Sequence, residues 1–259
     1  MDAGLYGPGS VSWRVNRERV VLLAGARALL MQLAHPRVAQ GVAEHSDFRR
    51  RPFRRLARTL TLSLDGVFGD TPTALGAVGR INRTHAAVRG PGYSAFDPDL
   101  LVWVMATLVD SGVLAYELFV GPLAAAEKNA YYAETRHATR VLGLPEAAAP
   151  ADFAALREYV DEMLARGEVA VTATGLVMGR ATLDPPAAWY IPRPAKDCIA
   201  FITAGMLPPA LRRQFRLPWS LRHRAAFDLF AAAVRAAVPR LPPPLRYVPQ
   251  ALRAARRVA

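Results

Sequence analysis

Two arginines and a hydroxyl near residue 55 are spaced in a way that could support chemistry. Arg55, Arg58 and Thr59 are three and four residues apart, so a helix would place them on one face. A guanidinium pair can grip carboxylates or phosphates, and a nearby hydroxyl can orient a bound water or oxygen molecule. The same arginine-rich run is more typical of a solvated helix face, but residue types alone leave both interpretations open.

A second group of polar residues precedes these arginines. Glu44, His45 and Ser46 offer an acid, a base and a hydroxyl in succession. Neighbouring residues on a helix point about 100° apart, so we expect that the three side chains cannot act together on one atom. One of them could still face a pocket.

His85 is a candidate for a different reason, because it stands in an apolar stripe. It continues the helical spacing of Val78, Ile81 and Val88, where a leucine would be usual. An inward-facing imidazole needs a partner, either a backbone carbonyl or a metal such as a haem iron. The other four histidines form no HxxxH or HxxE pair, which argues against a zinc site.

Several common protein classes are excluded by what the sequence lacks. It contains no GxSxG elbow, no glycine-rich phosphate loop and no GxGxxG sequence. A single cysteine, Cys198, rules out an intramolecular disulfide and multi-cysteine metal motifs. The longest run without a charged residue is 14 residues, 198–211, and no export signal is recognisable at the start. We therefore expect a cytoplasmic protein without a membrane-spanning helix.

The net charge of +12 is concentrated at one end of the chain. From residue 200 onward there are eleven arginines, no lysine and one acid, Asp228. These arginines alternate with apolar residues, which predicts a basic amphipathic face suited to peripheral contact with an anionic membrane, or a merely solvated surface. No zinc-finger, RNP or basic-zipper pattern supports specific nucleic-acid binding.

Apolar residues recur at three and four positions along nearly the whole chain, so we predict an all-α protein that needs no strands. Asn16 is expected to cap a helix that stops at His35-Pro36. The next predicted helix covers about 52–68, and the one after it carries His85 and ends before the break at 90–92. A helix over 98–120 follows, and then one that ends at 143. The last predicted helices cover 151–166, 168–181, 195–206 and 218–238. We expect one domain over residues 1–259, whose basic, proline-rich part is 184–259.

Long blocks of the chain resemble the oxygenase MpaB family, whose catalytic domain (domain of unknown function 2236) is shared with latex-clearing rubber oxygenases. The blocks that carry the resemblance include ARALLMQLAHPRVAQGVAEHSDF, RLARTL, RTHAAVRG, YSAFDPDLLVWVMATLVDS, GMLPPALRRQFRLPW and PRLPPPLRYVP. They are spread over nearly the whole chain. The resemblance implies a globin-like helical bundle around a haem b pocket, and oxygen-dependent cleavage of carbon-carbon double bonds in isoprenoid chains.

The resemblance also assigns roles to individual residues. His85 in RTHAAVRG matches the axial iron ligand, and Arg55, Arg58 and Thr59 match an Arg-x-x-Lys-Thr patch on the distal side, with arginine in place of lysine. A guanidinium has no lone pair to donate, so the sixth iron position is expected to be open or water-bound. His45 is the first candidate ligand if a second nitrogen does bind the iron.

Two further residues depart from the family pattern. Met105 in WVMATLVDS stands where many relatives have histidine, which would exchange a proton donor for a polarizable apolar contact if the residue touches the pocket. Glu44 is only a local candidate for the family's catalytic glutamate, because its spacing to the arginine patch does not align.

We therefore predict a haem b-dependent oxygenase, an oxidoreductase that acts with O₂ on a small apolar, isoprenoid or lipid-like substrate. The secreted rubber enzymes carry an export signal that this chain lacks, so polymeric rubber is not the expected substrate. Two alternatives come from other classes. One is a non-enzymatic haem or lipid binding protein on the same fold, and the other is a peripheral membrane-interaction module.

Overall fold

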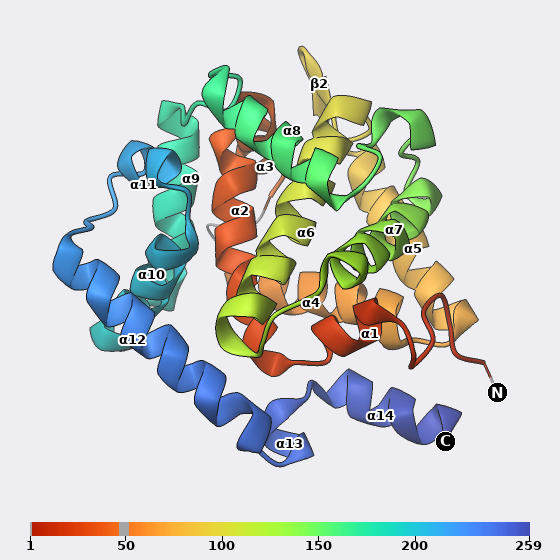
Figure 1. Cartoon of the computed structure of the whole chain (residues 1–259). Coiled ribbons are helices and arrows are strands. Elements are labelled where there is room, and N and C mark those ends of the chain that lie inside the picture. Colours follow the sequence, from red (N-terminus) through yellow and green to blue (C-terminus); the bar gives the residue numbers. More distant parts are fainter. Residues whose placement is uncertain (1, 47–51) are drawn as a thin grey trace.

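A computed structural model describes residues 2–46 and 52–259 of the chain. Within this part, fourteen α-helices and one two-stranded hairpin are present, so the predicted all-α class is confirmed. Helix α6 (Pro98–Phe119) runs through the centre of the molecule (Figure 1). It packs against α2 (Ala24–Ala34), α7 (Ala125–Val141), α8 (Phe153–Ala165) and α12 (Leu221–Ala237), which is why it is apolar on almost every side.

The first predicted helix is wrong at its start. Helix α1 (Val11–Asn16) ends at Asn16, whose side-chain amide donates to the carbonyl of Ser12 (2.9 Å) instead of capping the next helix. Glu18 then adopts an extended conformation, which interrupts the helical path, and the short 3₁₀ helix η1 (Arg19–Leu23) leads into α2. The predicted stop is confirmed, because α2 ends at Ala34 and α3 (Pro36–His45) begins after it.

Helix α4 (Pro52–Phe68) has the bounds that the sequence predicts, and α5 (Thr71–Ala86) follows after a tight turn. The expectation that no strands are needed is wrong between α5 and α6, where β1 (Arg89–Gly90) pairs antiparallel with β2 (Tyr93–Ser94). Gly92 has a φ of +79°, which lets the chain reverse within two residues and close this hairpin.

The remaining predicted helices exist, and others were missed. Helix α9 (Ala173–Leu183) begins later than predicted because the Thr172 hydroxyl caps it, whereas α10 (Arg193–Met206) lies close to the expected range. The missed helices are α3, which follows α2, and α11 (Pro209–Gln214), α13 (Pro243–Arg246) and α14 (Pro249–Val258). Each begins with a proline, because prolines that end one helix are also well suited to the first position of the next.

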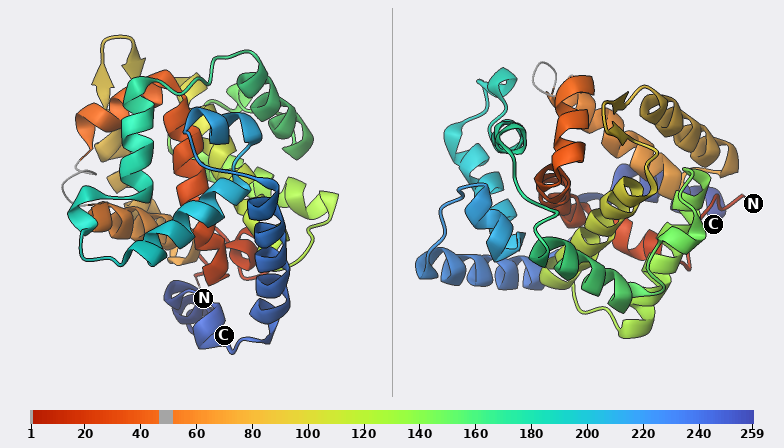
Figure 2. Two further views of the ribbon diagram at one scale, coloured as in Figure 1. Left: turned by 90° about the vertical axis from the view of Figure 1, so that its left-hand side faces the viewer. Right: turned by 90° about the horizontal axis from the view of Figure 1, so that it is seen from above.

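The helices enclose three apolar clusters. The main cluster lies around Trp103 of α6 and Leu30 of α2. A second joins the N-terminal region and α4 to α14, and the third joins α6 to α10 and α12. Residues 184–259, which we expect to belong to the same domain as the rest, thus pack against α4 and α6 (Figure 2).

Helix α6 is, within the described ranges, the one helix that is long and apolar enough by length and composition to cross a membrane. Of its most apolar stretch, 72% is buried inside the fold. Packing against the surrounding helices therefore accounts for its composition.

Candidate functional site between helices α4 and α5

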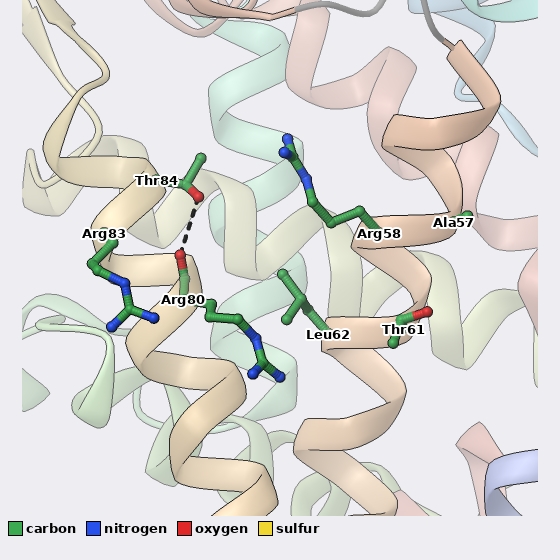
Figure 3. A pocket seen from close by; sticks show the side chains of 7 residues that line it. All are labelled: Ala57, Arg58, Thr61, Leu62, Arg80, Arg83 and Thr84. Atoms are coloured by element: carbon green, nitrogen blue, oxygen red, sulfur yellow. Dashed lines mark hydrogen bonds between the residues drawn. The ribbon is translucent and has the colours of Figure 1, made fainter.

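An open cleft of about 590 Å³ lies between α4 and α5 (Figure 3). On each helix, an arginine and the residues three and four positions after it face the cleft. The lining residues are Ala57, Arg58, Thr61 and Leu62 from α4, and Arg80, Arg83 and Thr84 from α5. Arg58 and Arg80 extend from opposite helices into the space between them, and Arg83 lies farther out on α5 (Figure 3).

The cleft is rich in uncompensated positive charge. Arg80 has one distant acid, Asp65, at 3.9 Å, and neither Arg58 nor Arg83 forms an ion pair with any described residue. The Thr84 hydroxyl donates to the carbonyl of Arg80 (3.0 Å), so its oxygen remains able to accept. Three guanidinium groups with free N–H donors around one cleft are suited to hold carboxylate or phosphate groups.

The structure separates some of the residues that the sequence groups together. Arg58 lines the cleft, but Thr59, one residue and about 100° further around α4, does not, and its side chain is exposed. Arg55 belongs to α4, and its side chain lies outside the described part. His85 does not line this cleft either, although its neighbour Thr84 does.

His85 instead faces the start of α6. Its ring is half-buried and meets the ring of Phe96 edge-on, with centroids 6.1 Å apart. Its Nδ1 atom is buried and has no hydrogen-bond partner among the described residues. Burial lowers the pKa of this imidazole, which keeps the ring neutral at pH 7 and leaves one nitrogen lone pair available.

Glu44 and His45 contradict the expectation that they could not act on one atom. The hydroxyl of Tyr93 donates to Glu44 Oε2, and His45 Nε2 lies 3.1 Å from the same hydroxyl oxygen. Both residues are in the last turn of α3, and their side chains are long enough to converge on a group held by β2. Tyr93, which sequence reasoning missed, therefore joins an acid and a base at one atom.

Met105 is buried in the main apolar cluster, 2% exposed, and contacts the hydroxyl of Thr139 on α7 through its sulfur at 3.5 Å. Met105 does not line the cleft between α4 and α5, and it is not among the residues that contact the Tyr93 hydroxyl. A polarizable apolar side chain suits this packed position between two helices.

Sequence reasoning also missed Arg80 and Arg83. Together with Thr84 they repeat the spacing of Arg55, Arg58 and Thr59, at i, i+3 and i+4. The same argument from helical spacing could have found them.

The helical fold and a matching family define an oxygenase catalytic domain. Residues 13–236 match the family described as "ER-bound oxygenase mpaB/B'/Rubber oxygenase, catalytic domain", so this chain belongs to that family and the resemblance is confirmed. Its membership makes the protein an oxygenase by family, and some members are named as bound to the endoplasmic reticulum.

Two mycobacterial proteins are similar over most of the chain. The uncharacterized protein Mb2261 of Mycobacterium bovis is 28% identical over 229 residues, which cover 83% of this chain and 88% of the relative. The uncharacterized protein Rv2237 of Mycobacterium tuberculosis shows the same identity and coverage.

Proposed function

We propose that this protein is a haem b-dependent oxygenase that acts with O₂ on a small apolar substrate of the isoprenoid or lipid-like class. The observation that carries the proposal is His85, a half-buried imidazole whose Nδ1 has no partner among the described residues. His85 directly follows Thr84 in α5, and Thr84 lines the cleft of about 590 Å³ together with the arginines of α4 and α5.

The residues present fit the cofactor. A neutral imidazole can offer a nitrogen lone pair to iron, and the lowered pKa of His85 keeps it in that form. The arginines of the cleft are suited to the two propionate carboxylates of a haem. When bound, haem supplies the binding and activation of oxygen.

The residues around the cofactor would orient it and its histidine ligand. Phe96 packs edge-on against the His85 ring and thereby restricts its plane. The guanidinium of Arg58 has no lone pair to give to iron, so it would act as a charge partner and not as a ligand.

Purification of two histidine variants tests the cofactor assignment. We expect the wild-type protein to show a haem Soret band that shifts on reduction with dithionite, and we expect His85→Ala to fold but to purify without haem. His137→Ala, which alters an exposed histidine of α7, is the matched control and should keep its haem. Full haem occupancy in a folded His85→Ala protein would refute the assignment of the ligand.

Oxygen uptake separates an enzyme from a binding protein. A haem-loaded protein that consumes O₂ when an isoprenoid or lipid is added is an oxygenase. Binding of the same lipid without oxygen uptake would favour the non-enzymatic haem or lipid binding protein instead.

A second candidate function is peripheral contact with an anionic membrane. Helix α12 carries two strongly exposed leucines, Leu221 (88%) and Leu229 (73%), on a surface that also holds the exposed Arg222, Arg224 and Arg235. Exposed apolar groups surrounded by arginines are the combination that inserts into a charged lipid surface. α12 lies along the outside of the molecule (Figure 1).

Flotation with phosphatidylserine vesicles tests this contact. We expect salt-sensitive binding that is lost in Leu221→Ser/Leu229→Ser and kept in Leu75→Ser, a control that removes an exposed leucine from α5. The absence of any salt-sensitive binding would leave these arginines as a solvated face. We expect no sequence-selective binding of nucleic acid, and a cytoplasmic location remains a prediction.

A further inference from the structure

A second and smaller pocket lies at the start of α6. It has a volume of about 190 Å³ and is formed where α2 meets α3, at the first turn of α6, and at the end of α8 with the segment that follows it. Its polar lining consists of His35, Asp99, Tyr159, Glu162, Arg166 and Glu168. None of these residues lines the cleft between α4 and α5.

His35 is the unusual residue in this pocket. Its side chain is only 7% exposed, and its Nδ1 atom is buried without a hydrogen-bond partner among the described residues. Burial, together with the charge of Arg37, lowers the pKa of His35, so the ring is neutral and one nitrogen can accept a hydrogen bond. Because Nδ1 is closed to solvent, a ligand in the pocket would meet the ring at its other nitrogen, Nε2, which also has no hydrogen-bond partner among the described residues.

The carboxylates of the pocket differ in how well they are neutralised. Asp99 is paired with Arg37, and Glu162 is paired with Arg166 at 3.0 Å. Glu168 forms no ion pair or hydrogen bond with any residue in the described ranges. The pocket therefore holds one uncompensated negative charge, in a protein whose net charge is +12.

The geometry favours an organic cation over a metal ion. Within residues 2–46 and 52–259, no three His, Cys, Asp or Glu side chains are arranged to hold a metal. An ammonium group makes different demands, because it needs acceptors on several sides but not a fixed coordination geometry. The ring of Tyr159 adds an aromatic wall against which an alkyl stem or a cation can pack.

We propose that this pocket binds a primary ammonium group on a short alkyl chain, which donates hydrogen bonds to His35 and Glu168. Such a group is carried by a free aliphatic amine and by the end of a lysine side chain of another protein. The two sources share one chemistry, and the choice of probes below distinguishes them.

Titration of the full-length protein with small amines tests the proposal by protein-observed NMR or calorimetry. The probes are 1,4-diaminobutane for a free amine and Nα-acetyl-lysine methylamide for a lysine side chain, and butan-1-ol is the uncharged control. We expect saturable binding of at least one amine and none of the alcohol. Preference for the first or second probe identifies the free amine or the lysine side chain as the source.

Two substitutions locate the binding site. Glu168→Gln, at an exposed side chain, should fold normally and weaken amine binding by roughly tenfold or more, because a charge-assisted hydrogen bond is lost. Glu158→Gln removes an exposed carboxylate of α8 that does not line the pocket, and it should leave binding unchanged. Equal affinity in both variants, or no amine binding to the wild-type protein, would overturn the proposal. Neither result depends on haem.

Discussion

The Tyr93 hydroxyl joins two side chains of α3 to the hairpin. The Tyr93 ring is 5% exposed and lies against two glycines, so that a Cβ atom would come within 3.2 Å of it from Gly41 and within 2.7 Å from Gly90. These glycines leave room for the ring, and the ring places its hydroxyl between Glu44 and His45. Burial, followed by the contact with Glu44, raises the pKa of Tyr93 to about 12.

We expect Tyr93→Phe to raise the pKa of Glu44 towards its usual value. The pKa of Glu44 is lowered chiefly by the Tyr93 hydrogen bond and secondarily by Gln40, so loss of the hydroxyl removes the larger cause. A carboxyl-carbon NMR titration of Glu44 measures the change. Tyr247→Phe is the control and should leave the Glu44 titration unaltered.

The same hydrogen bond makes stability depend on pH in a defined direction. Because the pKa of Glu44 is lower in the folded protein, the bond contributes stability above the unfolded pKa, and this contribution disappears as the pH falls through the folded pKa. The stability difference between wild type and Tyr93→Phe should therefore be present at pH 7 and shrink in acid. An unchanged Glu44 pKa in the variant would contradict this account.

Helices α10 and α12 pack together through a glycine. Gly205 of α10 faces the ring of Phe227 on α12 so closely that a Cβ atom there would overlap the ring. Phe227 also packs against Phe201 and Trp219, which limits how far its ring can move. The contact between these two helices thus depends on the absence of a side chain at residue 205.

We expect Gly205→Ala to destabilise the protein by about 1–3 kcal/mol, the usual cost of overpacking a core. The free energy of unfolding in urea measures the effect. Gly25→Ala is the matched control, because Gly25 is also within a helix but a Cβ atom there would meet nothing within 4 Å. The control should be neutral or stabilise by about 0.5–1 kcal/mol. Equal stabilities of the two variants would show that α10 and α12 can separate without cost.

At the scale of the whole molecule, a buried ion pair joins the two ends of the chain. Glu18 is fully buried, and both of its carboxylate oxygens accept from Arg246 of α13 at 2.8 Å. The Val248 amide donates to the carbonyl of Arg17 (2.9 Å) beside this pair. The hydrogen bond to Glu18 is the main cause that raises the pKa of Arg246, so its guanidinium remains charged.

We expect Arg246→Ala to lower the free energy of unfolding by about 3–5 kcal/mol, because it leaves the buried Glu18 carboxylate with only the more distant guanidinium of Arg17, at 3.7 Å, as a counter-charge. Thermal and urea unfolding measure the loss. Arg253→Ala, at an exposed arginine of α14, should change stability by less than about 0.5 kcal/mol. If Arg246→Ala loses as little stability as the control, water must reach the Glu18 carboxylate once Arg246 is removed.

The amino-acid sequence determined which segments become helices, because helical periodicity and proline positions are local properties. The bounds of α4 and α6 follow from Pro52 and Asp97-Pro98 and from the turns after them. The interruption after Asn16 did not follow, since it depends on the pairing of Glu18 with Arg246, 228 residues away. The family was also recognisable, because its residue blocks extend along most of the chain.

Only the tertiary structure decided which polar groups meet. Arg58 is joined by Arg80 and Arg83 because α4 and α5 lie side by side in one particular register, which neither helix specifies by itself. Glu44 and His45 point apart on α3, yet they converge because the hairpin brings the Tyr93 hydroxyl between them. Spacing along a helix determines the face on which a side chain stands, whereas packing between distant segments determines what that face meets.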